Sequence, residues 1–120
     1  MPFRDTLKGI VESVEGGLGV IIMGYDGIAI DEYFLDNAGL DLNLMTVEYS
    51  SLLKDVRHTA DILKAGGLEE MTVNTARSRV IMRTINDDLF LALILSPDGN
   101  YGKGRYLLRR EAFGLNERLS

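Results

Sequence analysis

The sequence predicts a three-layer α/β sandwich, in which helices cover both faces of a mainly antiparallel sheet. Residues 18–23 and 89–95 are apolar runs without polar alternation, and such runs are typical of strands covered on both faces. Short turns separate several of the expected strands, and short connections join antiparallel neighbours. The expected order is α-β-β-α-β-β-β-α. With 120 residues, the chain is expected to form one domain over residues 1–120.

The first helix is expected over residues 3–14, because apolar side chains recur there at helical spacing. These side chains are Phe3, Leu7, Ile10, Val11 and Val14. Gly16 and Gly17 follow and are expected to end the helix.

A hairpin is expected next. After the apolar strand at 18–23, Asp26-Gly27 predicts a tight turn, because glycine adopts positive φ angles at little cost. The returning strand becomes polar at Asp31 and Glu32, so we place it nearer an edge of the sheet.

The longest helix is expected over residues 44–65. A loop at 36–43 precedes it, and either Asp41 or Asn43 is a candidate N-cap. The apolar side of this helix comprises Met45, Tyr49, Leu52, Leu53, Val56, Ala60 and Leu63. Gly66-Gly67 predicts a left-handed cap at its end.

Three strands and a helix complete the fold. The strands are expected at 69–75, 79–85 and 89–95, and the first of them alternates between apolar and polar residues. The final helix is expected over 103–119, and Gly114 is a candidate interruption. Its buried side comprises Leu108, Ala112, Leu115 and Leu119.

Composition excludes several classes of function. Thirteen Lys and Arg face eighteen Asp and Glu, so the net charge is −5, whereas nucleic-acid binding needs a basic footprint. The absence of cysteine excludes disulfides, thiolate metal sites and thiol nucleophiles. No apolar run approaches the ~20 residues of a membrane span, and the first residues do not resemble an export signal. We therefore expect a cytoplasmic protein without membrane insertion or a nucleic-acid partner.

The glycine-rich stretch at 99–105 is a candidate phosphate loop. A Walker A loop needs four residues between its first glycine and Gly-Lys, and then a hydroxyl residue. Here two residues separate Gly99 from Gly102-Lys103, and glycine stands at the hydroxyl position. We interpret the stretch instead as a tight reversal made by Gly99 and Gly102, with Arg105 as its anchor.

The residues offer little for catalysis. His58 is the only histidine, and we place it on the polar side of the 44–65 helix. Ser51 lies two turns earlier, about 10.5 Å along the helix axis, which is too far for a hydrogen bond to His58. Asp87 and Asp88 are adjacent carboxylates, but they occupy an expected turn. We expect no catalytic residue, no metal and no cofactor.

Two features predict pairing with a second copy of the chain. The strand at 69–75 looks like the least covered edge of the sheet and carries charge only at its beginning, so its backbone is open to pairing. The 44–65 helix has an apolar sector wider than one seam, and a symmetric dimer uses the same patch twice. The expected interface comprises Tyr49, Leu52, Leu53, Val56, Met71, Thr72, Val73, Asn74 and Thr75.

The chain resembles the roadblock/dynein light chain family. The likeness rests on residues 19–30 (GVIIMGYDGIAI) and 99–110 (GNYGKGRYLLRR), together with the Gly-Gly break and following strand within 63–75. It covers nearly the whole chain and is greatest to short single-domain bacterial members, among them the gliding-motility GTPase regulators.

The resemblance implies a profilin-like fold, with a five-stranded antiparallel sheet, the long helix on one face and the terminal helices on the other. It also implies a homodimer in which the long helices lie antiparallel and the third strands join the two sheets. Members are binding platforms that regulate or scaffold small Ras-like GTPases, or serve as light chains of motor complexes.

The first hypothesis is therefore a non-catalytic homodimer that binds a small Ras-like GTPase in bacterial signalling. Candidate contacts on the long helix are Glu48, Ser51, Asp55 and His58. If hydrolysis is stimulated, the chain would order the switch residues of the GTPase, since it has no P-loop. An arginine supplied from Arg77, Arg79 or Arg83, which we place around the turn between the third and fourth strands, is the other route.

Two alternatives remain. The same architecture can hold a small molecule between sheet and helix, although the central strands offer few polar groups to orient one. An acidic hydrolase using Asp87 or Asp88 would need a base that the sequence does not indicate.

Overall fold

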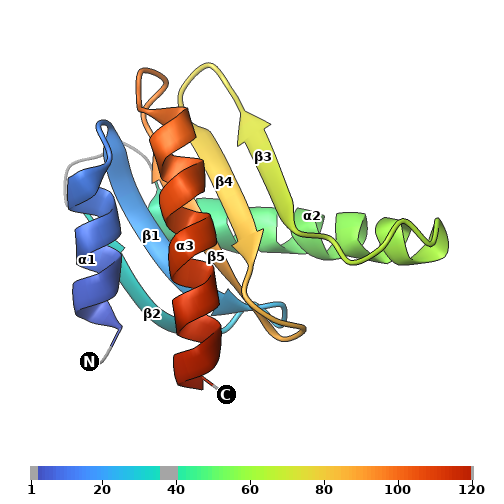
Figure 1. Ribbon diagram of the computed structural model, residues 1–120. Coiled ribbons are helices and arrows are strands. Elements are labelled where there is room, and N and C mark those ends of the chain that lie inside the picture. The colour runs from blue at the N-terminus through green and yellow to red at the C-terminus, as the bar shows by residue number, and fades with distance from the viewer. Residues whose placement is uncertain (1–2, 36–40, 120) are drawn as a thin grey trace.

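The computed structural model describes residues 3–35 and 41–119 (Figure 1). The predicted order of helices and strands is confirmed. The elements are α1 (Arg4–Ser13), β1 (Gly17–Gly24), β2 (Ala29–Phe34), α2 (Leu42–Ile62), β3 (Glu70–Asn74), β4 (Arg79–Thr84), β5 (Leu89–Leu95) and α3 (Tyr101–Leu119). Residues 36–40 of the expected loop at 36–43 lie outside the described residues.

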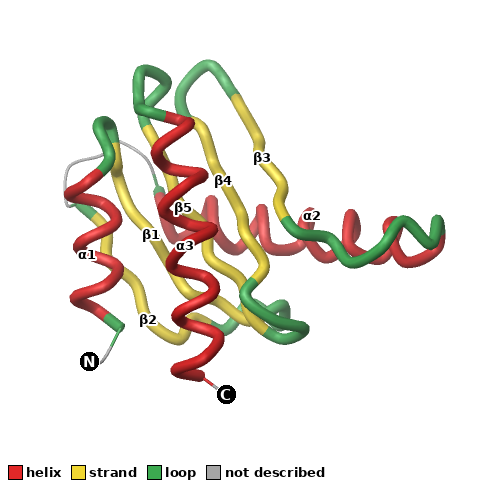
Figure 2. The backbone as a smooth tube through the Cα atoms, viewed as in Figure 1, coloured by secondary structure: helices red, strands yellow, loops and turns green. Residues whose placement is uncertain are grey.

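The five strands form one antiparallel sheet in the order β2-β1-β5-β4-β3 (Figure 2). The two apolar runs of the sequence are β1 and β5, which lie side by side inside the sheet. Their predicted double burial is confirmed, because nearly every residue of both strands is buried. The two edges are β2 and β3, as the sequence predicted.

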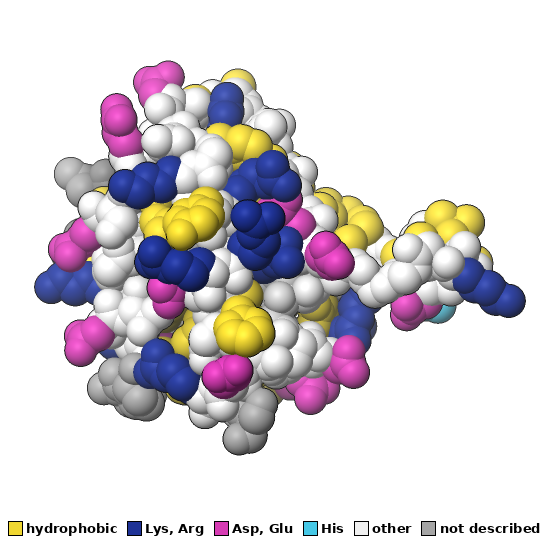
Figure 3. Space-filling view, in the orientation of Figure 1, with side chains coloured by type: hydrophobic (Ala, Val, Ile, Leu, Met, Phe, Trp, Pro, Cys, Tyr) yellow, Lys and Arg dark blue, Asp and Glu magenta, His cyan; other side chains and the backbone are white. Residues whose placement is uncertain are grey.

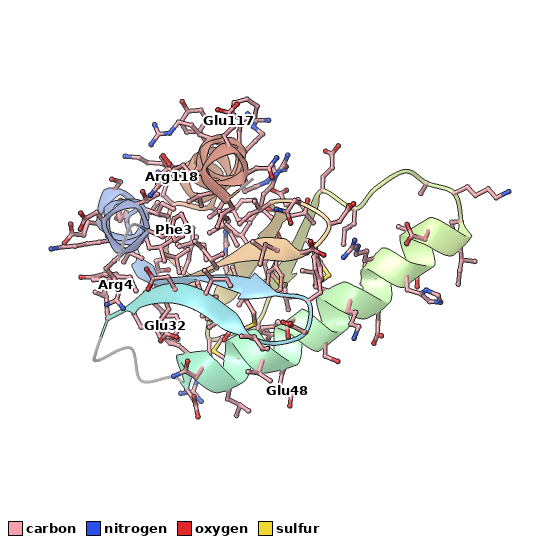
Figure 4. The ribbon with its side chains drawn as sticks, turned by 90° about the horizontal axis from the view of Figure 1, so that it is seen from below. Phe3, Arg4, Glu32, Glu48, Glu117 and Arg118 are labelled. Carbon is pink, nitrogen blue, oxygen red and sulfur yellow. The ribbon has the colours of Figure 1, made fainter. Side chains whose placement is uncertain are left out.

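Helices cover both faces of the sheet, so the predicted three layers are confirmed. Figure 4 shows α1 and α3 on one face and α2 on the other. Beneath α1 and α3, the core includes Leu7, Val20 and Leu108, and beneath α2 it includes Ile21, Leu53 and Phe90. Apolar side chains fill both spaces between sheet and helices.

The start of α3 corrects the interpretation of the glycine-rich stretch. The side chain of Asn100 caps the helix by accepting a hydrogen bond from the Lys103 N–H at 3.1 Å. Gly102 therefore lies inside the helix and not in a reversal. Gly99 does make the reversal, since a Cβ there would lie 3.0 Å from the carbonyl oxygen of Glu15.

Two further glycines of α3 differ in their surroundings. A Cβ on Gly104 would lie 3.1 Å from Leu93 and 3.3 Å from Ile81, so the absence of a side chain lets α3 approach the sheet closely. Gly114 has no atom within 4 Å of such a Cβ, and the helix continues through it to Leu119. The predicted interruption at Gly114 is therefore wrong.

Both ends of α2 differ from the prediction. Asp41 is the N-cap and accepts a hydrogen bond from the Leu44 N–H at 3.0 Å, so the helix begins at Leu42. It ends at Ile62 and not at 65, and the left-handed position falls on Lys64, with a φ of 53°. The N–H of Lys64 then donates to Asp61 and that of Ala65 to Ala60, a Schellman pattern.

The buried face of α2 is also shorter than predicted. Its buried residues are Leu42, Thr46, Ser50 and Leu53. The two hydroxyls are satisfied within the helix, because Thr46 donates to the Asn43 carbonyl and Ser50 to that of Val47. The C-terminal part of α2 extends past the sheet (Figure 1), and Leu63 is 70% exposed. Of the predicted apolar side, Leu53 is therefore buried in the single chain, whereas Leu52 and Leu63 are exposed.

Candidate interaction surface

The edge strand β3 has the properties of a strand that can pair. Within the sheet it is bonded to β4 alone, and their register is regular from Glu70 opposite Arg83 to Asn74 opposite Arg79. The residues between Glu70 and Asn74 carry no charge. An edge of this kind is a template for another strand.

The opposite edge, β2, is protected. Its register with β1 shifts between Ile22 and Met23, and such irregularities disrupt further pairing. Asp31, only 6% exposed, points a carboxylate inward from β2 and binds Arg4 of α1 at 3.3 Å. Bulges and inward-pointing charges are the devices that guard an edge against association. The two edges therefore differ, and β3 is the open one.

The predicted interface residues of α2 and β3 meet on one side of the sheet. Tyr49 of α2 and Met71 and Val73 of β3 pack against the same apolar cluster. Leu52 is exposed and Val56 half-buried beside them. Leu53 lies beneath, fully buried in the core of the single chain. Its contribution to an interface would therefore be to support its neighbours.

The remaining predicted residues of β3 and its following turn lie outside this group. Thr72 points to the α3 side of the sheet, where its hydroxyl lies 3.3 Å from that of Tyr101. Asn74 is exposed, and Thr75 lies in the following turn, where its hydroxyl donates to the Ser78 carbonyl.

The four candidate partner contacts form one exposed stripe. Glu48, Ser51, Asp55 and His58 are all exposed, and their spacing places them along one side of α2. His58 and Ser51 lie on an open surface, as the sequence indicated, and not in a pocket.

Tyr25 and Arg57 form a contact that sequence reasoning missed. The Arg57 guanidinium lies 4.3 Å from the centre of the Tyr25 ring and 3.8 Å from the Asp87 carboxylate. The Tyr25 hydroxyl is buried and has no hydrogen-bond partner among the described residues. Burial raises the pKa of Tyr25, while the Arg57 charge opposes the shift and the Asp87 charge adds to it. No local sequence pattern could have indicated this contact, because Arg57 looks like any other charged residue on the surface of a helix.

This contact joins the C-terminal half of α2 to the two turns at one end of the sheet. It also gives Asp87 a structural partner. Asp88 lies beside it along the same surface hollow as Tyr25. The chain's single histidine, His58, is exposed on α2.

The three candidate arginines do not lie together. Arg77 is in the β3–β4 turn, and Arg79 begins β4 with its guanidinium 5.7 Å from the Tyr101 ring. Arg83 lies at the other end of β4, opposite Glu70. The predicted place of Arg83 around the β3–β4 turn is wrong, because almost the whole of β4 separates Arg83 from that turn.

The described parts of the chain hold no cluster suited to a metal. Within residues 3–35 and 41–119, no three His, Asp or Glu side chains gather closely enough to bind an ion. Among the helices described, none combines the length and apolar composition needed to cross a bilayer.

Comparison with known proteins gives a homologue. No family model matches the chain, and no curated protein does. The crystal structure of MglC from Myxococcus xanthus is 44% identical in sequence, with 98% of this chain and 99% of that one covered and a TM-score of 0.72.

Two more distant structures share the fold. A Roadblock/LC7 domain from Streptomyces avermitilis matches with a TM-score of 0.82 at 16% identity, over 95% of this chain and 94% of that one. MglB in a tetrameric arrangement matches with a TM-score of 0.81 at 15% identity, over 94% and 84%. The chain is 44% identical to MglC over nearly its whole length and shares the fold of the Roadblock/LC7 domain. It therefore belongs to the roadblock family, as residues 19–30 and 99–110 indicated.

Proposed function

We propose that this chain is a non-catalytic regulatory module that works as a homodimer and binds a small Ras-like GTPase in the cytoplasm. The observation that carries the proposal is the contrast between the two edges of the sheet: β2 is guarded by Asp31 and an irregular register, whereas β3 is open. A chain that protects one edge and leaves the other unprotected is suited to pair through the second.

In the proposed dimer, two β3 strands pair antiparallel and join the sheets into one. A two-fold axis perpendicular to the joined sheet keeps both α2 helices on one face and both α3 helices on the other. The half of α2 that extends past the sheet then reaches beneath the partner copy, which would cover its apolar residues. The proposed interface comprises Tyr49, Leu52, Val56, Met71, Thr72, Val73, Asn74 and Thr75, supported from the core by Leu53.

The relatives support this proposal. MglB, which shares the fold, is found in a tetrameric arrangement, so self-association occurs in a protein of this shape. MglC is the relative at 44% identity, and another structure of this fold is the gliding protein MglB from Thermus thermophilus, so both support a role in that type of bacterial regulation.

The paired α2 helices provide the proposed platform for the GTPase. Their exposed stripe of Glu48, Ser51, Asp55 and His58 is polar, as suits a partner that binds and dissociates. If the dimer stimulates hydrolysis, it does so by ordering the switch residues of the GTPase, or through an exposed arginine such as Arg77. The alternative of small-molecule sensing finds less support, because the spaces between sheet and helices are filled with apolar side chains.

A binding measurement tests the GTPase assignment. Each small Ras-like GTPase of the source organism is loaded with GDP or with a non-hydrolysable GTP analogue and passed over the immobilised protein. We expect binding that prefers one nucleotide state and weakens about tenfold or more in Glu48→Lys/Asp55→Lys, because charge reversal repels a complementary surface. The control variant Glu117→Lys, on the opposite side of the sheet, should bind normally.

The outcomes separate the two parts of the proposal. Light scattering on each variant reports whether the dimer persists, so a loss of binding is assigned to the platform only in an intact dimer. An intact dimer that binds no GTPase in either state would refute the partner. Thermal stabilisation by a metabolite extract would then favour the sensing alternative.

A further inference from the structure

The outer face of α3 carries arginine and aromatic side chains together. Tyr106 is 52% exposed and Phe113 is 72% exposed, and the two lie two turns apart on one side of the helix. Figure 3 shows dark blue side chains gathered around hydrophobic ones over α3. We call this surface the α3 patch. It comprises Arg83, Arg105, Tyr106, Arg109, Arg110 and Phe113.

The positive charge of the α3 patch is only partly neutralised. Glu70 stands directly opposite Arg83 in the sheet, yet its carboxylate binds Arg105, at 2.6 Å. Arg110 binds the adjacent Glu111 at 3.1 Å. Within the described ranges, Arg83 and Arg109 have no carboxylate within ion-pair distance, although both line the same hollow beside Glu70. In a chain with a net charge of −5, this face keeps two unpaired guanidinium groups.

Three of the four arginines are restrained by the chain itself. Arg105 lies 5.6 Å from the centre of the Tyr101 ring, and Arg110 lies 5.7 Å from that of Tyr106. Arg83 projects from a strand and is half-buried, whereas Arg109 is exposed. A side chain that is already ordered loses less entropy when it binds, so of the two arginines without a carboxylate partner, Arg83 is the better prepared.

The composition of the patch favours a polypeptide over a metabolite. Glu70, Arg83, Arg105 and Arg109 line two hollows, of about 140 Å³ and about 550 Å³. Small-molecule pockets are lined predominantly by apolar and aromatic side chains, whereas both of these hollows carry charged side chains that suit carboxylates. Tyrosine and arginine are also the residues most enriched where protein partners bind tightly.

We propose that the α3 patch is a docking site for an acidic segment of a partner protein. Carboxylates of that segment pair with Arg83 and Arg109, and its apolar side chains cover Tyr106 and Phe113. The guanidinium fork matches a carboxylate in two parallel hydrogen bonds, which a lysine could not do. Glu70 and Glu111 already pair with Arg105 and Arg110, so Arg83 and Arg109 are the arginines left to bind the carboxylates of that segment.

The proposed site lies across the sheet from α2 (Figure 4). It is formed within one chain and does not depend on the dimer or on the GTPase. If both proposals hold, the dimer presents two α3 patches on one face while α2 binds the GTPase on the other. The module would then connect two partners.

Fluorescence anisotropy with the full chain tests the site. The probe is a short fluorescein-labelled peptide rich in Glu and Phe, and its matched form has Gln in place of every Glu. We expect saturable binding of the Glu peptide, much weaker binding of the Gln peptide, and a Kd that falls as salt is lowered. Arg83→Gln/Arg109→Gln should raise the Kd about tenfold or more, because two charge-assisted contacts are lost.

Two controls make the result specific. Lys54→Gln/Lys64→Gln removes the same charge from two exposed positions, one in α2 and one just after its end, and should leave the Kd unchanged. Phe113→Ser should weaken binding without altering charge, and its exposure makes an effect on folding small. Equal affinity for the Glu and Gln peptides, or equal effects of the two double variants, would overturn the proposal. So would sedimentation with phosphatidylserine vesicles that depends on Arg83 and Arg109 while the peptide does not bind.

Discussion

Asp31 shows how one residue can decide which surface of a molecule stays free. A buried carboxylate costs free energy unless it is paired, and Asp31 is paired on one side by Arg4 and by the Glu32 N–H. Its other oxygen has no partner among the described residues. Burying the Asp31 carboxylate therefore lowers the stability of the fold. The same inward-pointing charge keeps another strand from pairing with β2.

Tyr25 leads to a prediction about pH. Its hydroxyl is buried without a described partner, so Tyr25→Phe should leave stability unchanged or raise it slightly, while the ring keeps its contact with Arg57. Burial raises the pKa of Tyr25 in the folded protein above its unfolded value of 10.0. The contribution of this group to the free energy of unfolding is therefore fully present below about pH 10 and is lost as the pH rises further.

Urea unfolding at neutral pH and above pH 10 measures this effect. The original chain should lose more stability over that rise than Tyr25→Phe does. The same loss in both proteins would contradict the assigned burial. Tyr106→Phe is the control, because Tyr106 is exposed.

At the scale of elements, the caps of α2 explain where sequence prediction succeeded and where it failed. Asp41 and Asn43 were both candidate caps, and the geometry selects Asp41. The left-handed residue that ends α2 was predicted at Gly66-Gly67. It is Lys64 instead, because α2 ends at Ile62 and not at residue 65. Residue type alone does not fix such a position, since the hydrogen bonds of the last turn decide it.

The N-cap of α2 gives the second prediction. Asp41→Ala should lower the free energy of unfolding by about 1 kcal/mol, because the Leu44 N–H loses its acceptor. Asn43→Ala is the matched control and should have a smaller effect, since no capping bond comes from its side chain. Chemical denaturation measures both, and equal losses would contradict the assignment.

The glycines of α3 give the third prediction. Gly114→Ala should stabilise the protein by about 0.5–1 kcal/mol, because alanine is the better helix former and open space surrounds the site. Gly104→Val should destabilise it by about 1–3 kcal/mol, because the added carbons meet Leu93 and Ile81. Thermal and urea unfolding would show opposite signs for the two, and the same sign would contradict the close approach of α3 to the sheet.

For the whole molecule, the sequence predicted the layers, the edges and the buried faces of α1 and α3, but not that of α2. The runs in β1 and β5 required cover on both sides, and this alone implied three layers. The face of α2 was harder to predict, because Thr46 and Ser50 read as polar yet are buried with their hydroxyls bonded inside the helix.

The distance of Arg83 from the turn followed from the expected strand at 79–85, in which it is the fifth residue, and the prediction overlooked this. That Arg83 shares a hollow with side chains of α3 depends on how the helix packs on the sheet. Such packing between distant parts of the chain has no local signal. The candidate surface of α2 and β3 came from apolar spacing and stays a prediction, whereas the α3 patch could be proposed only from the three-dimensional arrangement.

The central claim is that the open edge of β3 makes this chain a dimer, and light scattering coupled to size exclusion tests it most directly. Val73→Lys places a charge on β3, and Ile30→Lys places the same charge on β2, the guarded edge, where Ile30 is 40% exposed. Circular dichroism checks that both variants remain folded. The account predicts twice the chain mass for the original protein and for Ile30→Lys, and a folded monomer for Val73→Lys. A monomer in all three, or a dimer lost only in Ile30→Lys, would contradict it.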